Sequence, residues 1–270
     1  MAGLLSACQV RGPELGGLSG PQSTGPAMEL AQRLWTTSQG IPAVAVRGSA
    51  NYVADNGGRH HFQFEALAQK PDIFQFLALG PTGSPAFRLL IHGEMAQTLD
   101  YGRKVHATGS RADLGAHPLP IPLSPEELTS LLIGGLVAPP SQAELLRVSQ
   151  GPSPRTVIRV WPEGGGFLAR LTLDGAPGAE RVPVIRELVS QTRSGERLEI
   201  NYDDIRAVTR RDAGVEPREL DFPFRIAARL GGSRNRRSLA ISYDQVVLGA
   251  LLDPGSFYLA TPVGFAQEWL

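Results

Sequence analysis

The pattern of apolar positions changes its period near the start of the chain. In residues 27–38, Leu30 and Leu34 stand four positions apart, which predicts a short amphipathic helix. A glycine and a proline just beyond it are expected to end that helix. From residue 44 onward, apolar and polar residues alternate with a period of two, which is typical of strands with one buried and one solvated face.

Two consecutive hairpins are predicted first. Strand 44–52 leads into Asp-Asn-Gly-Gly at 55–58, a turn sequence that tolerates positive φ, and strand 59–66 returns from it. We expect strand 73–79 to pair with strand 59–66, with the phenylalanines of both on one concave face. A register shift of one residue would turn those phenylalanines to solvent.

The alternation of apolar and polar residues continues in the rest of the chain. Further strands are expected at 87–92, 95–99, 103–108, 156–161, 167–173, 182–190, 197–202, 222–230 and 239–243. Two helical segments interrupt them, one at 124–136 with Ser124 as its cap and Pro125 in its first position, and one at 141–147. Strands do not alternate with helices, so a parallel sheet is not expected. The pattern predicts a mainly β protein: an antiparallel meander that is strongly curved or nearly a barrel, with residues 27–270 as a single domain.

The apolar faces of these strands are the candidate functional surface. Many strands carry one apolar face each, and few helices are available to cover them. The sheet therefore encloses either a packed core or an incompletely filled cavity for a lipid chain, and the pattern alone leaves both open. The candidate cavity residues are Phe62, Phe64, Phe74, Phe76, Phe87, Leu89, Ile91, Phe224 and Ile226.

The N-terminus carries a candidate lipid-anchor site. Leu-Ser-Ala-Cys at 5–8 resembles the bacterial lipobox, in which the cysteine, here Cys8, is acylated. We interpret 1–8 as a truncated remnant of a signal peptide and 9–26, rich in Gly, Pro and Ser, as a flexible tether. The segment before Cys8 has seven residues and no Lys or Arg, so it lacks the charged and apolar parts of a complete signal peptide.

Composition narrows the function further. Lys and Arg number 26, and so do Asp and Glu, and this zero net charge argues against a nucleic-acid partner. A single cysteine excludes an internal disulfide. No nucleophile elbow, phosphate loop or metalloprotease motif is present, and His60 and His61, adjacent on a strand, point to opposite faces. We therefore expect no enzymatic activity, no metal and no cofactor. No apolar run approaches 18 residues, so no membrane-spanning helix is expected either.

The order of these features resembles the LolA/LolB lipoprotein-localisation superfamily, especially its outer-membrane receptor and related lipoproteins. The lipobox, tether, short helix, meander and leucine-rich helix follow in that order over residues 27–262 and the segment before them. The segments that carry the resemblance are 46–50, 70–72, 79–83, 128–135 and 257–262.

This resemblance implies an unclosed antiparallel β-barrel with a short helical lid and a cavity for lipoprotein acyl chains. It implies a protein on the periplasmic face of the bacterial outer membrane, held there by its lipid anchor, with an acyl chain or a lipoprotein as cargo. The family receptor presents an apolar residue on the loop that matches Gly80, Pro81, Thr82 and Gly83, and Thr82 departs from that pattern. The alternative is an envelope scaffold lipoprotein that uses the same fold with a filled core.

Overall fold

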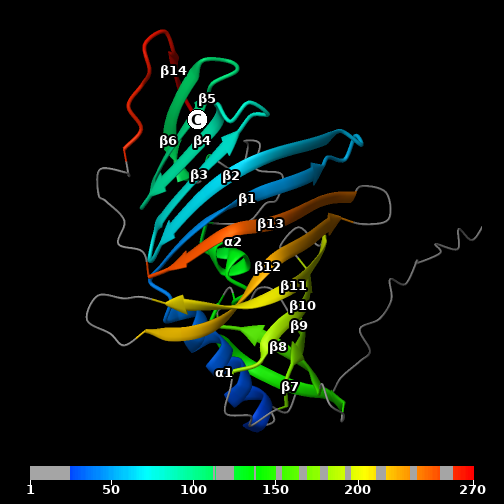
Figure 1. Cartoon of the computed structure of the whole chain (residues 1–270). Helices are drawn as coiled ribbons and strands as arrows, with labels where there is room; N and C mark the ends of the chain where they lie inside the picture. The colour runs from blue at the N-terminus through cyan, green and yellow to red at the C-terminus, as the bar shows by residue number, and fades with distance from the viewer. Residues whose placement is uncertain are drawn as a thin grey trace, which may run out of the picture.

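The chain forms one large curved sheet in the computed structural model. The residues described are 25–111, 113, 125–136, 138–149, 154–163, 169–176, 182–191, 196–210, 217–231, 236–249 and 258–270. The expected segment 1–8 with Cys8, and the expected tether 9–26 up to residue 24, lie outside them, while residues 25 and 26 of the tether belong to the first helix. Within the described part, 14 strands belong to a single sheet that bends around two helices (Figure 1).

Two meanders build this sheet. The first contains the strands β1 (Ala43–Val53), β2 (Arg59–Gln69), β3 (Ile73–Leu79), β4 (Pro85–His92), β5 (Met95–Asp100) and β6 (Val105–Ser110). The second contains β7 (Pro140–Ser149), β8 (Arg155–Pro162), β9 (Ala169–Asp174), β10 (Val184–Gln191), β11 (Arg197–Arg210), β12 (Arg218–Gly231) and β13 (Arg236–Leu248). Consecutive strands pair antiparallel within each meander. The expected antiparallel, strongly curved and mainly β fold is therefore confirmed.

The two meanders meet at an antiparallel pair between β1 and β13 in the middle of the sheet. The register of this pair shifts between Arg47 and Gly48, where a β-bulge occurs. A Cβ on Gly48 would lie 2.1 Å from the carbonyl oxygen of Ser242, so the backbones approach more closely than a side chain allows. The pair leaves β7 at one edge of the sheet and β14 (Ala266–Trp269) at the other.

The first hairpins have the register expected from the sequence. Ala50 of β1 lies opposite Phe62 of β2, and Ala66 of β2 lies opposite Phe76 of β3. The pairing predicted between 59–66 and 73–79 is confirmed. The alternation of the two strands then places these phenylalanines on the same face of the sheet.

The helix expected at 141–147 is wrong, because residues 140–149 form the edge strand β7. Its apolar residues also fit a period of two, since Ala143 is buried and Leu145 packs against the core. Pairing with β8 satisfies the backbone, and Glu144 forms an ion pair with Arg159 at 3.1 Å. Tertiary pairing has overridden the helical tendency of a short segment that contains Ala, Glu and Leu.

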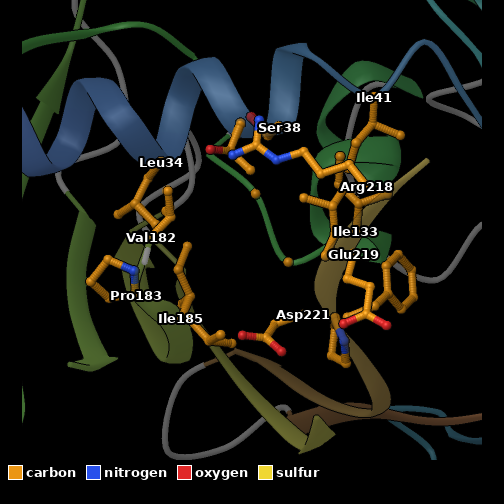
Figure 2. Close-up of a pocket in the computed structure, with 17 residues that line it drawn as sticks. Leu34, Ser38, Ile41, Ile133, Val182, Pro183, Ile185, Arg218, Glu219 and Asp221 are labelled. Carbon is orange, nitrogen blue, oxygen red and sulfur yellow. The ribbon is translucent and has the colours of Figure 1, made fainter. Parts of the chain in front are cut away.

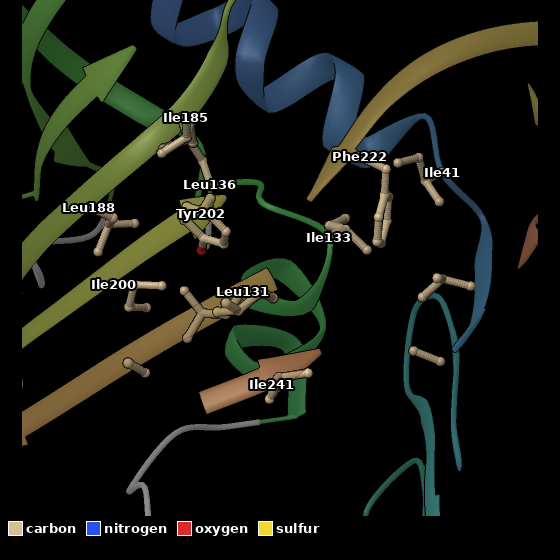
Figure 3. Packing of buried hydrophobic residues seen from close by; sticks show 14 of the residues in the cluster. Ile41, Leu131, Ile133, Leu136, Ile185, Leu188, Ile200, Tyr202, Phe222 and Ile241 are labelled. Carbon is tan, nitrogen blue, oxygen red and sulfur yellow. The ribbon is translucent and has the colours of Figure 1, made fainter. Parts of the chain in front are cut away.

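Two helices cover the concave face of the sheet. Helix α1 (Gly25–Gln39) begins two residues before the expected start and contacts β7, whereas α2 (Pro125–Leu132) lies under the middle of the sheet (Figure 1). Gly134, with φ of 69°, follows α2 and ends it earlier than the expected residue 136. Between the helices and the sheet lies the main core, with Leu131 and Leu136 packed among residues of β10 to β13 (Figure 3).

A second, smaller core lies on the convex face. Leu259 of the C-terminal segment packs there against Leu90 of β4 and Leu99 of β5. Beyond it, β14 pairs parallel with β6 and forms the edge of the sheet. The C-terminal residues 258–270 therefore cover part of the outer face and extend the first meander by one strand.

Candidate ligand cavity

A cavity of about 450 Å³ lies between the first meander, β13 and α2. Its size falls within the range of roughly 300–1,000 Å³ that small-molecule sites occupy. Nearly all of its lining side chains are apolar. They are Ala50, Tyr52, His60, Phe62, Phe64, Ala66, Phe74, Phe76, Ala78, Phe87, Leu132, Leu239 and Ile241.

The space exists because large and small side chains face each other across the strands. Each lining phenylalanine on β2, β3 and β4 has an alanine as a cross-strand partner on one side: the pairs are Ala50 with Phe62, Ala78 with Phe64 and Phe87, Ala66 with Phe76, and Ala68 with Phe74. On their other side, Phe76 lies opposite Leu89 and Phe74 lies opposite Ile91. Directly opposed side chains pack against each other in an antiparallel sheet. Since alanine carries only a methyl group, the space beside each aromatic ring is not filled from the strand that provides the alanine.

The aromatic walls are held by one another. The ring of Phe76 stacks on Phe64 at 5.7 Å between centroids and meets Phe62 edge to face at 6.2 Å. Phe64 in turn contacts the ring of Tyr243, from β13, at 6.2 Å. Such arrangements are favourable for aromatic pairs. The wall is therefore tied both to the first meander and to β13.

Helix α2 is fixed over the cavity by a hydrogen bond. Leu132, the last residue of α2, lines the cavity, and its backbone oxygen accepts a hydrogen bond of 3.3 Å from the hydroxyl of Tyr243. Burial raises the pKa of Tyr243 well above its ordinary value, so the hydroxyl stays protonated and remains a donor. The bond satisfies a carbonyl at the helix C-terminus that has no partner within the helix.

Two polar side chains, Tyr52 and His60, lie among the described lining residues. Their rings stack at 6.1 Å near the β1–β2 turn. Burial is the largest effect on the pKa of Tyr52 and raises it, while Arg237 lowers it and Asp55 raises it. The Arg237 guanidinium is itself paired, with Asp55 at 3.4 Å and with Glu196 at 3.1 Å.

His61 lies on the opposite face from its neighbour, as expected from strand alternation. Its Nδ1 is 2.9 Å from Oδ1 of Asn51 across the hairpin, away from the cavity. Among the described residues, no three His, Cys, Asp or Glu side chains are placed to hold a metal ion together.

The structure places the nine candidate cavity residues in two environments. Phe62, Phe64, Phe74, Phe76 and Phe87 line the cavity. The other four belong to the main core and are absent from the lining; they are Leu89, Ile91, Phe224 and Ile226. The residues on β12 are covered by neighbouring strands and side chains.

The neighbours of the two β12 residues explain why they are buried in the core and do not line the cavity. Ile226 lies opposite Ile241 of β13, and the guanidinium carbon of Arg206 lies 4.4 Å from the centre of the Phe224 ring.

The loop expected to face a membrane is an exposed tight turn between β3 and β4. The amide of Gly80 donates to the carbonyl of Ser84, and Gly83 has φ of 77°. The hydroxyl of Thr82 bonds that of Ser84 at 2.9 Å, so the tip of this turn is polar. Cys8, the candidate lipid anchor, lies outside the described residues.

Several lining residues were not selected from the sequence. Leu239 and Ile241 were recognised as strand residues, but their place in the lining, opposite Tyr52 and Ala50, depends on the long-range β1–β13 pair. The position of Leu132 in the lining depends on how α2 packs against the sheet. The alanines could have been found from the predicted hairpin register, because each falls opposite a phenylalanine.

A separate cavity of about 140 Å³ lies between α1, the loop after α2 and strands β10 and β12 (Figure 2). Arg218, Glu219 and Asp221 are among the residues around it. These charged groups make it a poor site for a hydrocarbon chain. In the described part of the chain, no helix has the length and hydrophobicity needed to cross a membrane.

Three solved structures have the same fold. A DUF1329 family protein from Desulfovibrio piger matches with a TM-score of 0.60 and 10% identity, over 87% of this chain and 98% of that one. An outer membrane lipoprotein-sorting protein domain, described as putative, from Vibrio parahaemolyticus matches with a TM-score of 0.54 and 11% identity, over 86% of this chain and 95% of that one. A LolA superfamily protein from Nitrosomonas europaea matches with a TM-score of 0.54 and 10% identity, over 85% of this chain and 97% of that one.

These matches confirm, at the level of the fold, the resemblance and the unclosed barrel expected from the sequence. No protein-family model and no curated protein sequence matches the chain.

Proposed function

We propose that this protein is a non-enzymatic binding protein of the bacterial cell envelope that holds an acyl chain, of a lipoprotein or of another hydrophobic ligand. The observation that carries the proposal is the apolar cavity between the phenylalanine-lined sheet and α2. An apolar cavity of this kind prefers a hydrocarbon guest to water. The lipoprotein-sorting fold of the structural neighbours supports the same assignment.

The energetics are sufficient for binding. Burial of apolar surface contributes about 25 cal/mol per Å², so an acyl chain that buries a few hundred Å² gains several kcal/mol. Association costs part of this gain, and micromolar affinity is the expected order of magnitude. The scaffold alternative, with the same fold and a filled core, predicts no binding at all.

Phe76→Glu tests the cavity. Its side chain is half-buried and faces the space, so the new carboxylate repels a hydrocarbon guest, while water that enters the cavity can solvate it. We expect uptake of a fluorescent fatty acid to be lost and the melting temperature to stay near that of the wild type. Met95→Glu is the matched control, because Met95 is 51% exposed and lies outside the cavity.

Two outcomes would favour the scaffold instead. The first is a wild-type protein that takes up no lipid probe. The second is a Phe76→Glu variant that fails to fold, which is expected if the site is packed core.

We further propose that Cys8 carries the acyl groups and anchors the domain to the periplasmic face of the outer membrane. Two or three acyl chains hold a protein stably at a membrane, at about 0.8 kcal/mol per buried CH₂. Behind a complete lipoprotein signal peptide, Cys8→Ala should leave the protein uncleaved or in the soluble fraction, as measured by membrane fractionation. A Cys8→Ala protein that still sediments with the outer membrane would contradict the anchor.

A further inference from the structure

A second cavity, of about 270 Å³, has one lining residue, Phe74, in common with the ligand cavity. Helix α2 also borders both, with Leu132 on the ligand cavity and with Thr129 and Ser130 on the second. The remaining walls of the second cavity come from the last turns of α1 and from the β2–β3 turn, where Lys70 lies. Phe74 and α2 therefore belong to the walls of both spaces.

Lys70 brings a positive charge into this second cavity. Its ammonium donates a hydrogen bond of 2.5 Å to the backbone oxygen of Ser38, near the C-terminus of α1. An ammonium group has three donors, and no second acceptor for it is found among the described residues. No carboxylate of the described residues forms an ion pair with it.

The other charged residue of the lining does not neutralise Lys70. The carboxylate of Asp72 lies beside the β4–β5 turn, where its Oδ2 would be 3.5 Å from a Cβ placed on Gly93. Burial is the cause that lowers the pKa of Lys70 to about 8, whereas a carboxylate close to the ammonium would raise it. Lys70 differs in this respect from Arg237, at the other end of the ligand cavity, because Arg237 has two carboxylate partners.

A half-buried cation without a counter-ion is costly, and an anion that enters the cavity relieves that cost. The surrounding groups suit the charged end of an amphiphile. Gln39, Gln69 and the α2 hydroxyls provide hydrogen-bonding side chains, while Trp35 and Phe74 provide apolar walls.

We propose that Lys70 binds the negatively charged end of the ligand, so that the molecule held in the apolar cavity is an acidic amphiphile with a carboxylate or phosphate group. This inference rests on the proposed function, since it identifies the class of molecule that the same site takes. The hydrocarbon chain occupies the phenylalanine-lined cavity, passes Phe74 and ends with its anionic oxygens at Lys70.

The test compares decanoate with 1-decanol as competitors of the neutral fluorophore N-phenyl-1-naphthylamine, bound to the full chain at pH 6.5 and at pH 9.5. At pH 6.5 decanoate is ionised and Lys70 is charged, and we expect decanoate to compete about tenfold more strongly than 1-decanol. At pH 9.5 Lys70 is mostly neutral, and the advantage should disappear.

Three variants test whether the advantage of decanoate over 1-decanol comes from Lys70. Lys70→Met should abolish the advantage of decanoate at both pH values. Lys70→Arg should keep it at pH 9.5 as well, because a guanidinium stays charged there. Lys104→Met is the matched control, since Lys104 is the other lysine of the chain, is exposed, and should leave the wild-type behaviour unchanged.

A direct readout does not depend on variants that fold. Reductive ¹³C-methylation labels the two lysines and any free α-amino group, and the Lys70 signal should move when decanoate is added and stay in place with 1-decanol. A shift caused by inorganic phosphate alone would assign the cavity to a free anion and overturn the head-group proposal.

The possible failures are distinguishable. Equal competition by decanoate and 1-decanol would overturn the role of Lys70 while leaving the acyl-binding function intact. An advantage of decanoate that persists in Lys70→Met would place the charged end elsewhere and also overturn it. Absence of fluorophore binding to the wild-type protein would overturn the proposed function itself, and this inference with it.

Discussion

The ligand cavity depends as much on its smallest residues as on its aromatic ones. Ala50, Ala66 and Ala78 lie on three neighbouring strands, opposite phenylalanines, and leave the space between the rings unfilled. Cores are normally packed to the density of organic crystals. An alanine at each of these positions therefore maintains a void that a larger residue would close.

Filling this void should separate binding from stability. In Ala66→Leu the added carbons enter the cavity, so we expect fatty-acid affinity to fall at least tenfold while the melting temperature stays the same or rises. The measurements are a probe titration and a thermal melt. In the control, Ala96→Leu, the side chain is fully buried and lies outside the cavity, so overpacking should cost about 1–3 kcal/mol with little direct effect on the site. Unchanged affinity in Ala66→Leu would place the ligand elsewhere.

At the scale of elements, the hairpins of the first meander were predictable because their information is local. The turn at 55–58 and the alternation on either side of it determine the register, and the structure has that register. The placement of Phe62, Phe64 and Phe76 on one face follows from it. The cavity is predictable to the same extent, through those phenylalanines.

Elements whose own residues do not mark their structure were harder to predict. The strand β7 was taken for a helix because Ala, Glu and Leu favour helices, whereas its pairing with β8 decides its structure. The strand β14 was not predicted, and its four residues are all exposed, so no alternation marks it. Leu89 and Phe224 have the same apolar pattern as the lining residues, and only the packing of the sheet distinguishes core from cavity.

The β1–β13 pair is the element contact that joins the two meanders, and Gly48 permits it. We expect Gly48→Ala to lower the free energy of unfolding by about 1–3 kcal/mol or more, because the methyl group meets the Ser242 carbonyl in a paired backbone. Urea unfolding measures this change. Gly80→Ala is the control, since the nearest atom to its Cβ is 3.6 Å away, an ordinary contact. Equal stability of the two variants would show that the pair can adjust.

At the scale of the whole molecule, an open sheet has two edges, and different elements cover or form them. The edge strand β7 packs against α1, whereas the opposite edge is formed by β14 from the C-terminal segment. This segment also covers Leu90 and Leu99 through Leu259. Without it, an apolar patch and the unpaired edge of β6 would both be open to solvent.

Removal of residues 258–270 should therefore cause self-association. We expect the truncated protein to elute as oligomers or aggregates in size-exclusion chromatography with light scattering, and to melt at a lower temperature than the full chain. Trp269→Ser is the control, because that side chain is 85% exposed and its loss should leave the protein monodisperse. A monodisperse truncated protein with wild-type stability would show that the edge of β6 is protected in another way.

The position of β1 beside β13 also has a consequence for folding. Most of the chain separates these two central neighbours, which gives the fold a high contact order and predicts slow folding. Until residue 248 has been synthesised, β1 has no partner on one side, and the cavity lacks the wall that Leu239 and Ile241 provide. The first six strands alone therefore cannot form the complete site, and the ability to bind a ligand requires that β13 has paired with β1.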